Sequence, residues 1–187
     1  IALISYSEEH RGALPPAYTV DKDGKPLHSW RTLILPYLDQ EALYEKIDLT
    51  KPWDDAANAG ARKTGMEVFL CPAAVLPTNK TTYLAVVAPG GCFGPTEPRP
   101  ISEITDGCGE TLMLIEVDPA HAVHWMAPRD AGEALFLALS PKSKHAHGGG
   151  VHAAFVDGTV RFLNDNMVLE TRRALISIAG NEHLTDF

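Results

Sequence analysis

The feature that most constrains the fold is an Asp-Gly pair that separates two short apolar segments near the carboxyl end of the chain. Residues 151–156 (V-H-A-A-F-V) precede Asp157-Gly158, and residues 159–163 (T-V-R-F-L) follow it. Asp and Gly tolerate the positive φ angles that a tight two-residue turn requires. The pattern therefore predicts a β-hairpin, which is introduced by His145, His147 and three consecutive glycines.

Four other segments predict strands, and the first ten residues predict a helix. Residues 111–117 (T-L-M-L-I-E-V) are almost entirely apolar, which is typical of a central strand covered on both faces. We expect further strands at 66–71, 82–88 and 122–126, the last antiparallel to its neighbour 111–117. Residues 1–10 have the composition of the end of an amphipathic helix.

The size and charge of the chain limit its organisation and its partners. With 187 residues and 45% hydrophobic residues, it can form one sizeable core, so we expect a single domain over 1–187. The net charge is −8 and basic residues are not clustered. Nucleic-acid binding depends on clustered Lys and Arg, and we therefore expect no nucleic-acid partner.

The histidines before and within the hairpin are the candidate metal ligands. His145 and His147 alternate with Ala146 and would project together from an extended backbone, with His121 or Asp157 as a third ligand. His152 lies within the first strand of the hairpin. The sequence equally permits structural or solvent-facing histidines, and we favour these, with no metal and no cofactor. A metal-dependent hydrolase is accordingly the least favoured function.

Five motifs occur in order along the chain: residues 28–54, the Phe69-Leu70-Cys71-Pro72 box, Thr82-Tyr83-Leu84-Ala85, Ile104-Thr105-Asp106-Gly107, and a His followed after nine residues by Asp-Gly. Together they resemble a planctomycete pilin-like family of unknown function, DUF1559, which is also labelled as solute-binding. The last motif corresponds here to His147, Asp157 and Gly158. His152 departs from the family pattern, in which Asn is common at this position.

The resemblance implies an α+β, pilin-like or pseudopilin-like fold. It would consist of a truncated N-terminal spine helix and a helical insertion packed on an antiparallel sheet of four to six strands. The resemblance also implies export, to the cell surface or the periplasm, with anchoring in the inner membrane by a helix upstream of Ile1. Partners would be other pilin-like subunits or components of a type II secretion-like system, and the subunit would be non-enzymatic.

The three cysteines and one Gly/Pro-rich loop leave alternatives open. In an exported protein a disulfide is permitted, and we expect Cys92 with Cys108 because both lie in Gly-rich turns, although three reduced cysteines are also possible. The loop at 89–100 is rich in glycine and proline, so we expect it to be exposed. A surface site for carbohydrate or another solute, using Cys92, Phe93 and Trp125, is the alternative to an assembly subunit.

Overall fold

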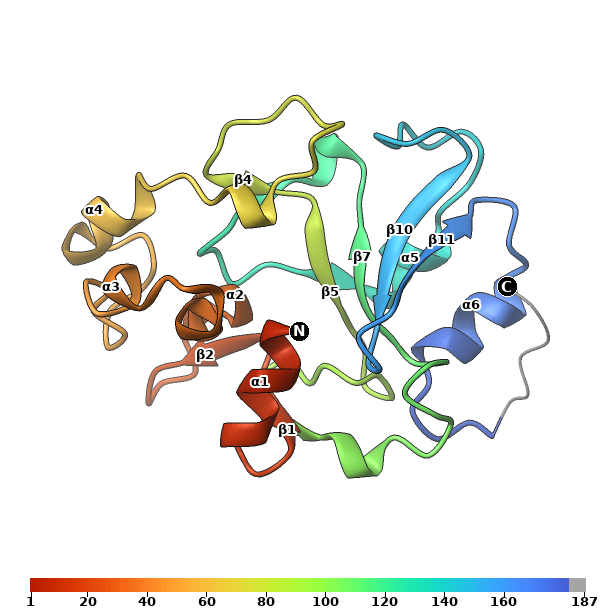
Figure 1. Ribbon diagram of the computed structural model, residues 1–187, viewed down its shortest axis with the longest axis horizontal. Coiled ribbons are helices and arrows are strands. Elements are labelled where there is room, and N and C mark those ends of the chain that lie inside the picture. Colours follow the sequence, from red (N-terminus) through yellow and green to blue (C-terminus); the bar gives the residue numbers. More distant parts are fainter. Residues whose placement is uncertain (182–187) are drawn as a thin grey trace.

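The computed structural model describes residues 1–181 and is built around a five-stranded sheet. The strands lie in the order β11-β10-β7-β5-β9 (Figure 1). Their bounds are β5 Tyr83–Val87, β7 Leu112–Glu116, β9 Ala131–Gly132, β10 Gly150–Phe155 and β11 Val160–Asn164. All pairings are antiparallel except β5 with β9. The α+β class, the strand near 82–88 and the central position of 111–117 are confirmed.

The predicted hairpin is formed by β10 and β11. The Asp157 carboxylate accepts hydrogen bonds from the Thr159 amide (2.8 Å) and hydroxyl (2.7 Å), which fixes the turn. Gly158 has a φ of +85°, a conformation that residues with a Cβ rarely adopt. A Cβ on Gly158 would also lie 3.1 Å from the Ile4 Cδ1 of the first helix. The Asp-Gly pair thus serves both the turn and the close approach of that helix.

Short helices and hairpins from the first third of the chain cover one face of the sheet. The predicted N-terminal helix is confirmed as α1 Ala2–Glu9. It is followed by β1 Ala13–Leu14, β2 Tyr18–Val20, β3 Pro26–Ser29, α2 Trp30–Leu33, η1 Leu35–Leu38, α3 Glu41–Tyr44, η2 Ala56–Asn58 and α4 Ala59–Arg62. Their apolar side chains form one core with the side chains that this face of the sheet presents, including Ala85, Met113 and Val156.

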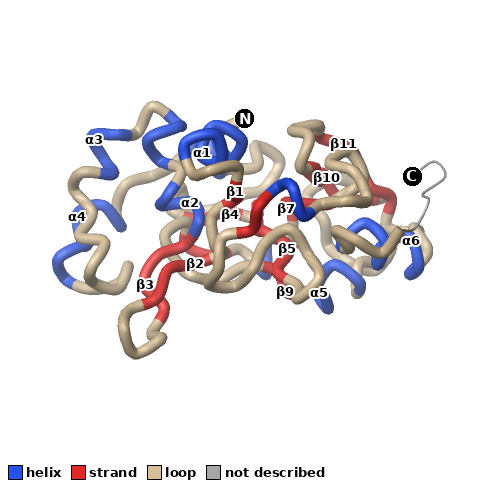
Figure 2. Tube along the Cα trace, turned by 90° about the horizontal axis from the view of Figure 1, so that it is seen from below, coloured by secondary structure: helices blue, strands red, loops and turns tan. Residues whose placement is uncertain are grey.

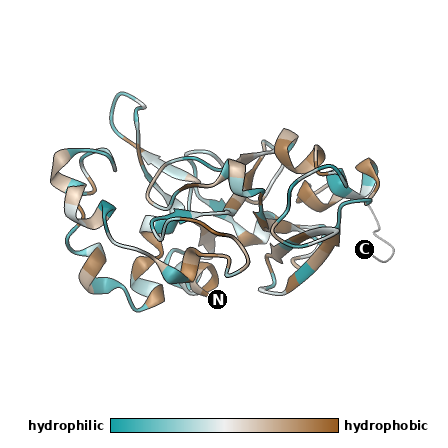
Figure 3. Cartoon of the chain, turned by 90° about the horizontal axis from the view of Figure 1, so that it is seen from above, coloured by the Kyte–Doolittle hydropathy of each residue, from teal (hydrophilic) through white to brown (hydrophobic). Residues whose placement is uncertain are grey.

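The opposite face of the sheet carries a second core. Leu84, Ile115 and Phe155 point to this side and pack with Phe136 of α5 Glu133–Leu137 and Leu175 of α6 Leu169–Ile176. The helices α1 and α2 therefore lie on one side of the sheet, with α3 and α4 farther out, and α5 and α6 lie on the other side (Figure 2). Hydrophobic residues occur in the helices at both ends of the molecule as well as in the strands between them (Figure 3).

Two strand predictions are wrong. Residues 66–71 include the 3-10 helix η3 Glu67–Phe69, because Met66 and Phe69 are buried at a spacing of three rather than two. Residues 122–126 contain only β8 Val123–His124, which pairs with β4 Lys80–Thr81 in a separate sheet. The Asp118 side chain caps η5 Pro119–His121 and so turns the chain away from β7.

The remaining elements are β6 Arg99–Pro100, which pairs with β1, and the 3-10 helix η4 Ile101–Glu103. Within residues 1–181, no helix combines the length and the apolar composition needed to span a bilayer.

Candidate functional site

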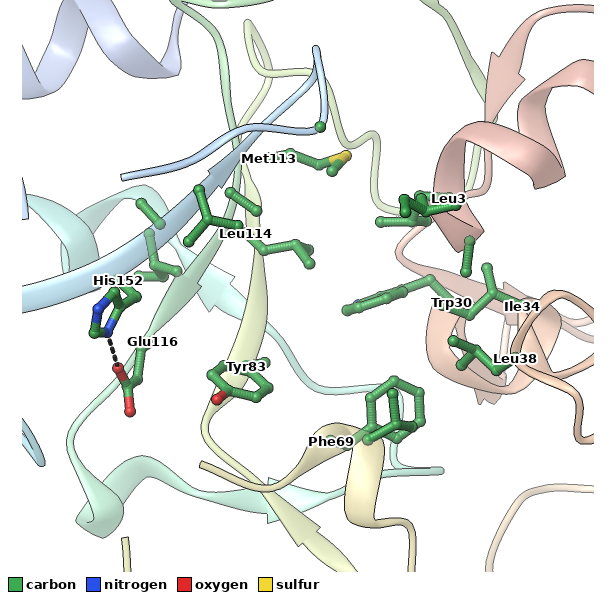
Figure 4. Close-up of a pocket in the computed structure, with 18 of the residues that line it drawn as sticks. Leu3, Trp30, Ile34, Leu38, Phe69, Tyr83, Met113, Leu114, Glu116 and His152 are labelled. Atoms are coloured by element: carbon green, nitrogen blue, oxygen red, sulfur yellow. Dashed lines mark hydrogen bonds and ion pairs between the residues drawn. The ribbon is translucent and has the colours of Figure 1, made fainter. Parts of the chain in front are cut away.

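An apolar pocket of about 530 Å³ lies between the N-terminal helices and the sheet. Figure 4 shows Leu3, Trp30, Ile34 and Leu38 on one wall and Met113 and Leu114 of the sheet on the other. Tyr83 lies between the two walls, Phe69 lies below Leu38 on the helical side, and Glu116 and His152 line the sheet side. A volume in this range is typical of sites that bind small molecules.

The helical wall of the pocket, which contains Trp30, is held in place by the buried carboxylate of Asp130. Asp130 Oδ1 accepts hydrogen bonds from Trp30 Nε1 (3.0 Å), from Arg31 Nη1 (2.9 Å) and from the amide of Ala85 in β5 (2.8 Å). The Arg31 and Asp130 side chains are 0% and 2% exposed. Phe69 packs edge-on against Trp30, with ring centroids 6.3 Å apart. The helical wall and the sheet wall are therefore joined through Asp130.

One end of the pocket is polar: Glu116, His147 and His152 line it, and Cys71 lies beside them. Glu116 Oε2 lies 3.4 Å from His147 Nε2 and 3.3 Å from His152 Nδ1. Cys71 Sγ lies 3.4 Å from the same His147 Nε2. Within the described residues, the ligand atoms of Cys71, Glu116 and His147 form a group in which all lie within 4.8 Å of one another.

Burial changes the titration of two groups around this cluster. It raises the pKa of the Cys71 thiol, and the neighbouring Glu116 carboxylate raises it further. Burial, Cys71 and Glu116 together raise the pKa of Tyr83 to about 12. The unliganded site thus holds a neutral thiol and a neutral phenol beside the carboxylate.

The contacts do not match a nucleophilic triad. In a triad, the acid orients the histidine through one ring nitrogen while the nucleophile uses the other. Here Cys71 and Glu116 both approach His147 Nε2. The side chains converge on one region rather than forming a relay, an arrangement that suits a bound cation better than nucleophilic catalysis.

The structure separates the members of the predicted histidine motif. His147 precedes β10 and lies beside Glu116, whereas Asp157 follows β10, so Asp157 does not join His147 as a ligand. Of the three candidate ligands, His147 and His152 meet, with ring centroids 4.5 Å apart. His145 is absent from the cluster found among the described residues, and both of its ring nitrogens are buried without a hydrogen-bond partner there.

The proposed solute site at Cys92, Phe93 and Trp125 is wrong. All three residues are 0% exposed. Phe93 packs on Trp30, and Trp125 Nε1 donates a hydrogen bond to the Thr64 carbonyl (3.0 Å). The expected Cys92–Cys108 disulfide is also not formed, because the three cysteines are free thiols and Cys92 Sγ contacts the Leu112 carbonyl at 3.2 Å.

Comparison with known families bears on the amino-terminal half of the chain. Residues 1–86 match the model of SBP_bac_10, described as a protein of unknown function (DUF1559). The resemblance to DUF1559 that the sequence predicts is confirmed over these residues. The DUF1559 match ends within β5, so the motif of His147, Asp157 and Gly158 lies outside it and its family resemblance stays a prediction. No curated protein and no solved structure matches the chain.

The residues that sequence reasoning missed are Cys71, Tyr83 and Glu116. Cys71 is buried, with an exposure of 2%, and the sequence assigns it no role beyond its place in the Phe69-Leu70-Cys71-Pro72 box. Glu116 is the single charged residue of an otherwise apolar central strand. A buried charge in such a strand needs a compensating partner, so the position of Glu116 in the sequence was the signal that could have indicated a site there.

Proposed function

We propose that this chain is a non-enzymatic binding domain that takes up a small, largely apolar molecule in the pocket between its helices and its sheet. The observation that carries the proposal is the pocket itself, with aromatic and aliphatic walls and one polar end. Apolar pockets with a few convergent polar groups are the usual form of small-molecule sites. The ligand would be amphipathic, with its polar group toward Glu116 and His152.

A fluorescent apolar probe tests this function directly. N-phenyl-1-naphthylamine should become brighter on binding to the purified chain and should be displaced by fatty acids or similar amphipathic molecules. Ala154→Phe fills the pocket from β10, whereas Ala57→Phe makes the same change at an exposed position outside it. We expect A154F to weaken binding by at least about tenfold, or about 1.4 kcal/mol, and A57F to leave it unchanged. Equal binding by both variants would refute the proposal.

The second candidate function is an exported, pilin-like or pseudopilin-like subunit of a surface or type II secretion-like assembly. The observation that favours it is the order of elements, in which α1 comes first and shares a core with the antiparallel sheet. The match of residues 1–86 to DUF1559 is compatible with this role. Other pilin-like subunits and the membrane would then be its partners, and a bound solute could be cargo or a signal.

Fractionation of the native cells tests the second candidate. An antibody raised against this domain should detect the full-length protein in the membrane or cell-surface fraction, and surface filaments should carry the label in electron micrographs. Recovery of the whole pool from the cytosolic fraction would exclude an exported subunit. It would leave the probe-binding result untouched.

A further inference from the structure

Glu116 is a buried carboxylate that the protein itself compensates poorly. Its side chain is 3% exposed, and Oε1 has no hydrogen-bond partner among the described residues. Its ion-pair contacts in that part of the chain are with His147 and His152, which carry a positive charge only when protonated. Buried carboxylates are normally paired with a cation or coordinate a metal. Glu116 therefore indicates a missing positive charge.

The two N···O distances to Glu116 fit neighbouring ligands of a tetrahedral metal site better than hydrogen bonds. Zinc lies about 2.0–2.1 Å from nitrogen and oxygen ligands, which separates two such ligands by about 3.3 Å at a tetrahedral angle, and about 2.3 Å from sulfur. The two N···O distances to Glu116 are 3.4 and 3.3 Å. Hydrogen bonds between these atom types usually measure about 2.9–3.0 Å. The groups therefore converge without bonding well to one another.

We propose that Cys71, Glu116 and His147 bind a zinc ion, with His152 as the fourth ligand. A thiolate, an imidazole and a carboxylate are all ligands that Zn²⁺ accepts in tetrahedral sites. His152 lies outside the group of three ligand atoms, but its Nδ1 contacts Glu116 Oε2 and its side chain is 43% exposed, so it is the nearest side chain that could turn toward the ion as a fourth ligand. The Cys71 proton leaves for solvent when the Zn–S bond forms. The site does not depend on a solute in the pocket.

Cobalt substitution tests the site with a spectroscopic readout. The chain is purified without a polyhistidine tag, stripped with a chelator, and titrated with Co²⁺ and then Zn²⁺. We expect one ion per chain, visible bands of tetrahedral cobalt, and a thiolate-to-cobalt charge-transfer band that Zn²⁺ removes. Cys71→Ser should abolish the charge-transfer band, whereas Cys108→Ser, at the partly exposed cysteine, should retain it.

Two further variants separate metal binding from folding. Glu116→Gln and His147→Gln should weaken Zn²⁺ binding at least about 100-fold, the upper end of what outer-shell changes produce. Glu116→Gln keeps the shape of the side chain and removes the buried charge, so the metal-free variant should melt no lower than the metal-free parent. Zinc should raise the melting temperature of the parent and of His121→Gln but not of the ligand variants. His121 is exposed and lies outside the cluster.

Three results would overturn the zinc site. The first is that the chain takes up no metal at an equimolar concentration, and the second is that Cys71→Ser leaves metal uptake unchanged. The third is that the metal-free Glu116→Gln variant melts at a temperature well below that of the metal-free parent. The last result would mean that the carboxylate itself stabilises the fold. Failure of probe binding to the pocket would not bear on any of these measurements, so the two proposals fail separately.

Discussion

Removing the Asp130 carboxylate should destabilise the protein strongly, because it compensates a buried cation. Asp130→Ala leaves the Arg31 guanidinium, which is 0% exposed, without its ion-pair partner and deprives Trp30 and Ala85 of a hydrogen-bond acceptor. Loss of one partner of a buried pair typically costs about 3–5 kcal/mol. For 187 residues at about 2.1 cal/mol/K each, the unfolding entropy is about 0.4 kcal/mol/K, so the melting temperature should fall by about 8–13 °C.

Urea unfolding and calorimetry measure this loss. Burial raises the pKa of Asp130 to about 6, although Arg31 opposes the rise, so the experiment belongs near pH 8, where the carboxylate is ionised. Asp23→Ala is the control, since Asp23 contacts Lys22 at 3.8 Å on the surface and such pairs contribute about 0–1 kcal/mol. Replacing both partners, as Arg31→Met with Asp130→Leu, should recover much of the loss. A cost below about 1 kcal/mol for Asp130→Ala would refute the reasoning.

Three other predictions concern titration, packing and thiol reactivity. Burial lowers the pKa of His28 below its usual 6.5, so His28 contributes stability that is present above pH 6.5 and is lost as the pH falls through the lower pKa of the folded state. In thermal melts, the His28→Gln variant should therefore lose less stability on acidification than the parent. Parallel stability profiles of variant and parent would contradict this. A Cβ on Gly150 would lie 2.1 Å from the Leu163 carbonyl oxygen, so Gly150→Ala should lower the free energy of unfolding in urea by about 2 kcal/mol or more. Gly132→Ala is the control and should not lower it, because a Cβ at Gly132 meets open space. A maleimide should modify Cys108 quickly and Cys92 slowly, because Cys92 is 0% exposed and burial raises its pKa to about 12. Rapid modification of more than one thiol would be inconsistent with the fold.

Local patterns in the sequence predict the hairpin, the central strand β7 and the helix α1. Each depends on neighbours in the chain: the Asp-Gly turn pairs β10 with β11, and the apolar run 111–117 requires cover on both faces. The Gly/Pro-rich loop shows where this reasoning fails. Its composition predicts an irregular, exposed segment, yet Arg99–Pro100 forms β6 and pairs with β1. Phe93 is buried, because Trp30, sixty-three positions earlier, packs on it.

The metal cluster could not be predicted because its members are distant in sequence. Cys71, Glu116 and His147 meet only because β10 pairs with β7 in the sheet and the η3 segment packs beside that pair. The alternation of His145 with His147 suggested that these two would act together, but backbone alternation holds only in an extended strand. Both residues precede β10, in an irregular segment rather than a strand.

The contact between Ile4 and Gly158 makes α1 and the β10–β11 hairpin mechanically dependent on each other. A side chain at position 158 would press on Ile4, so Gly158→Ala would disturb the position of α1 as well as the turn between β10 and β11.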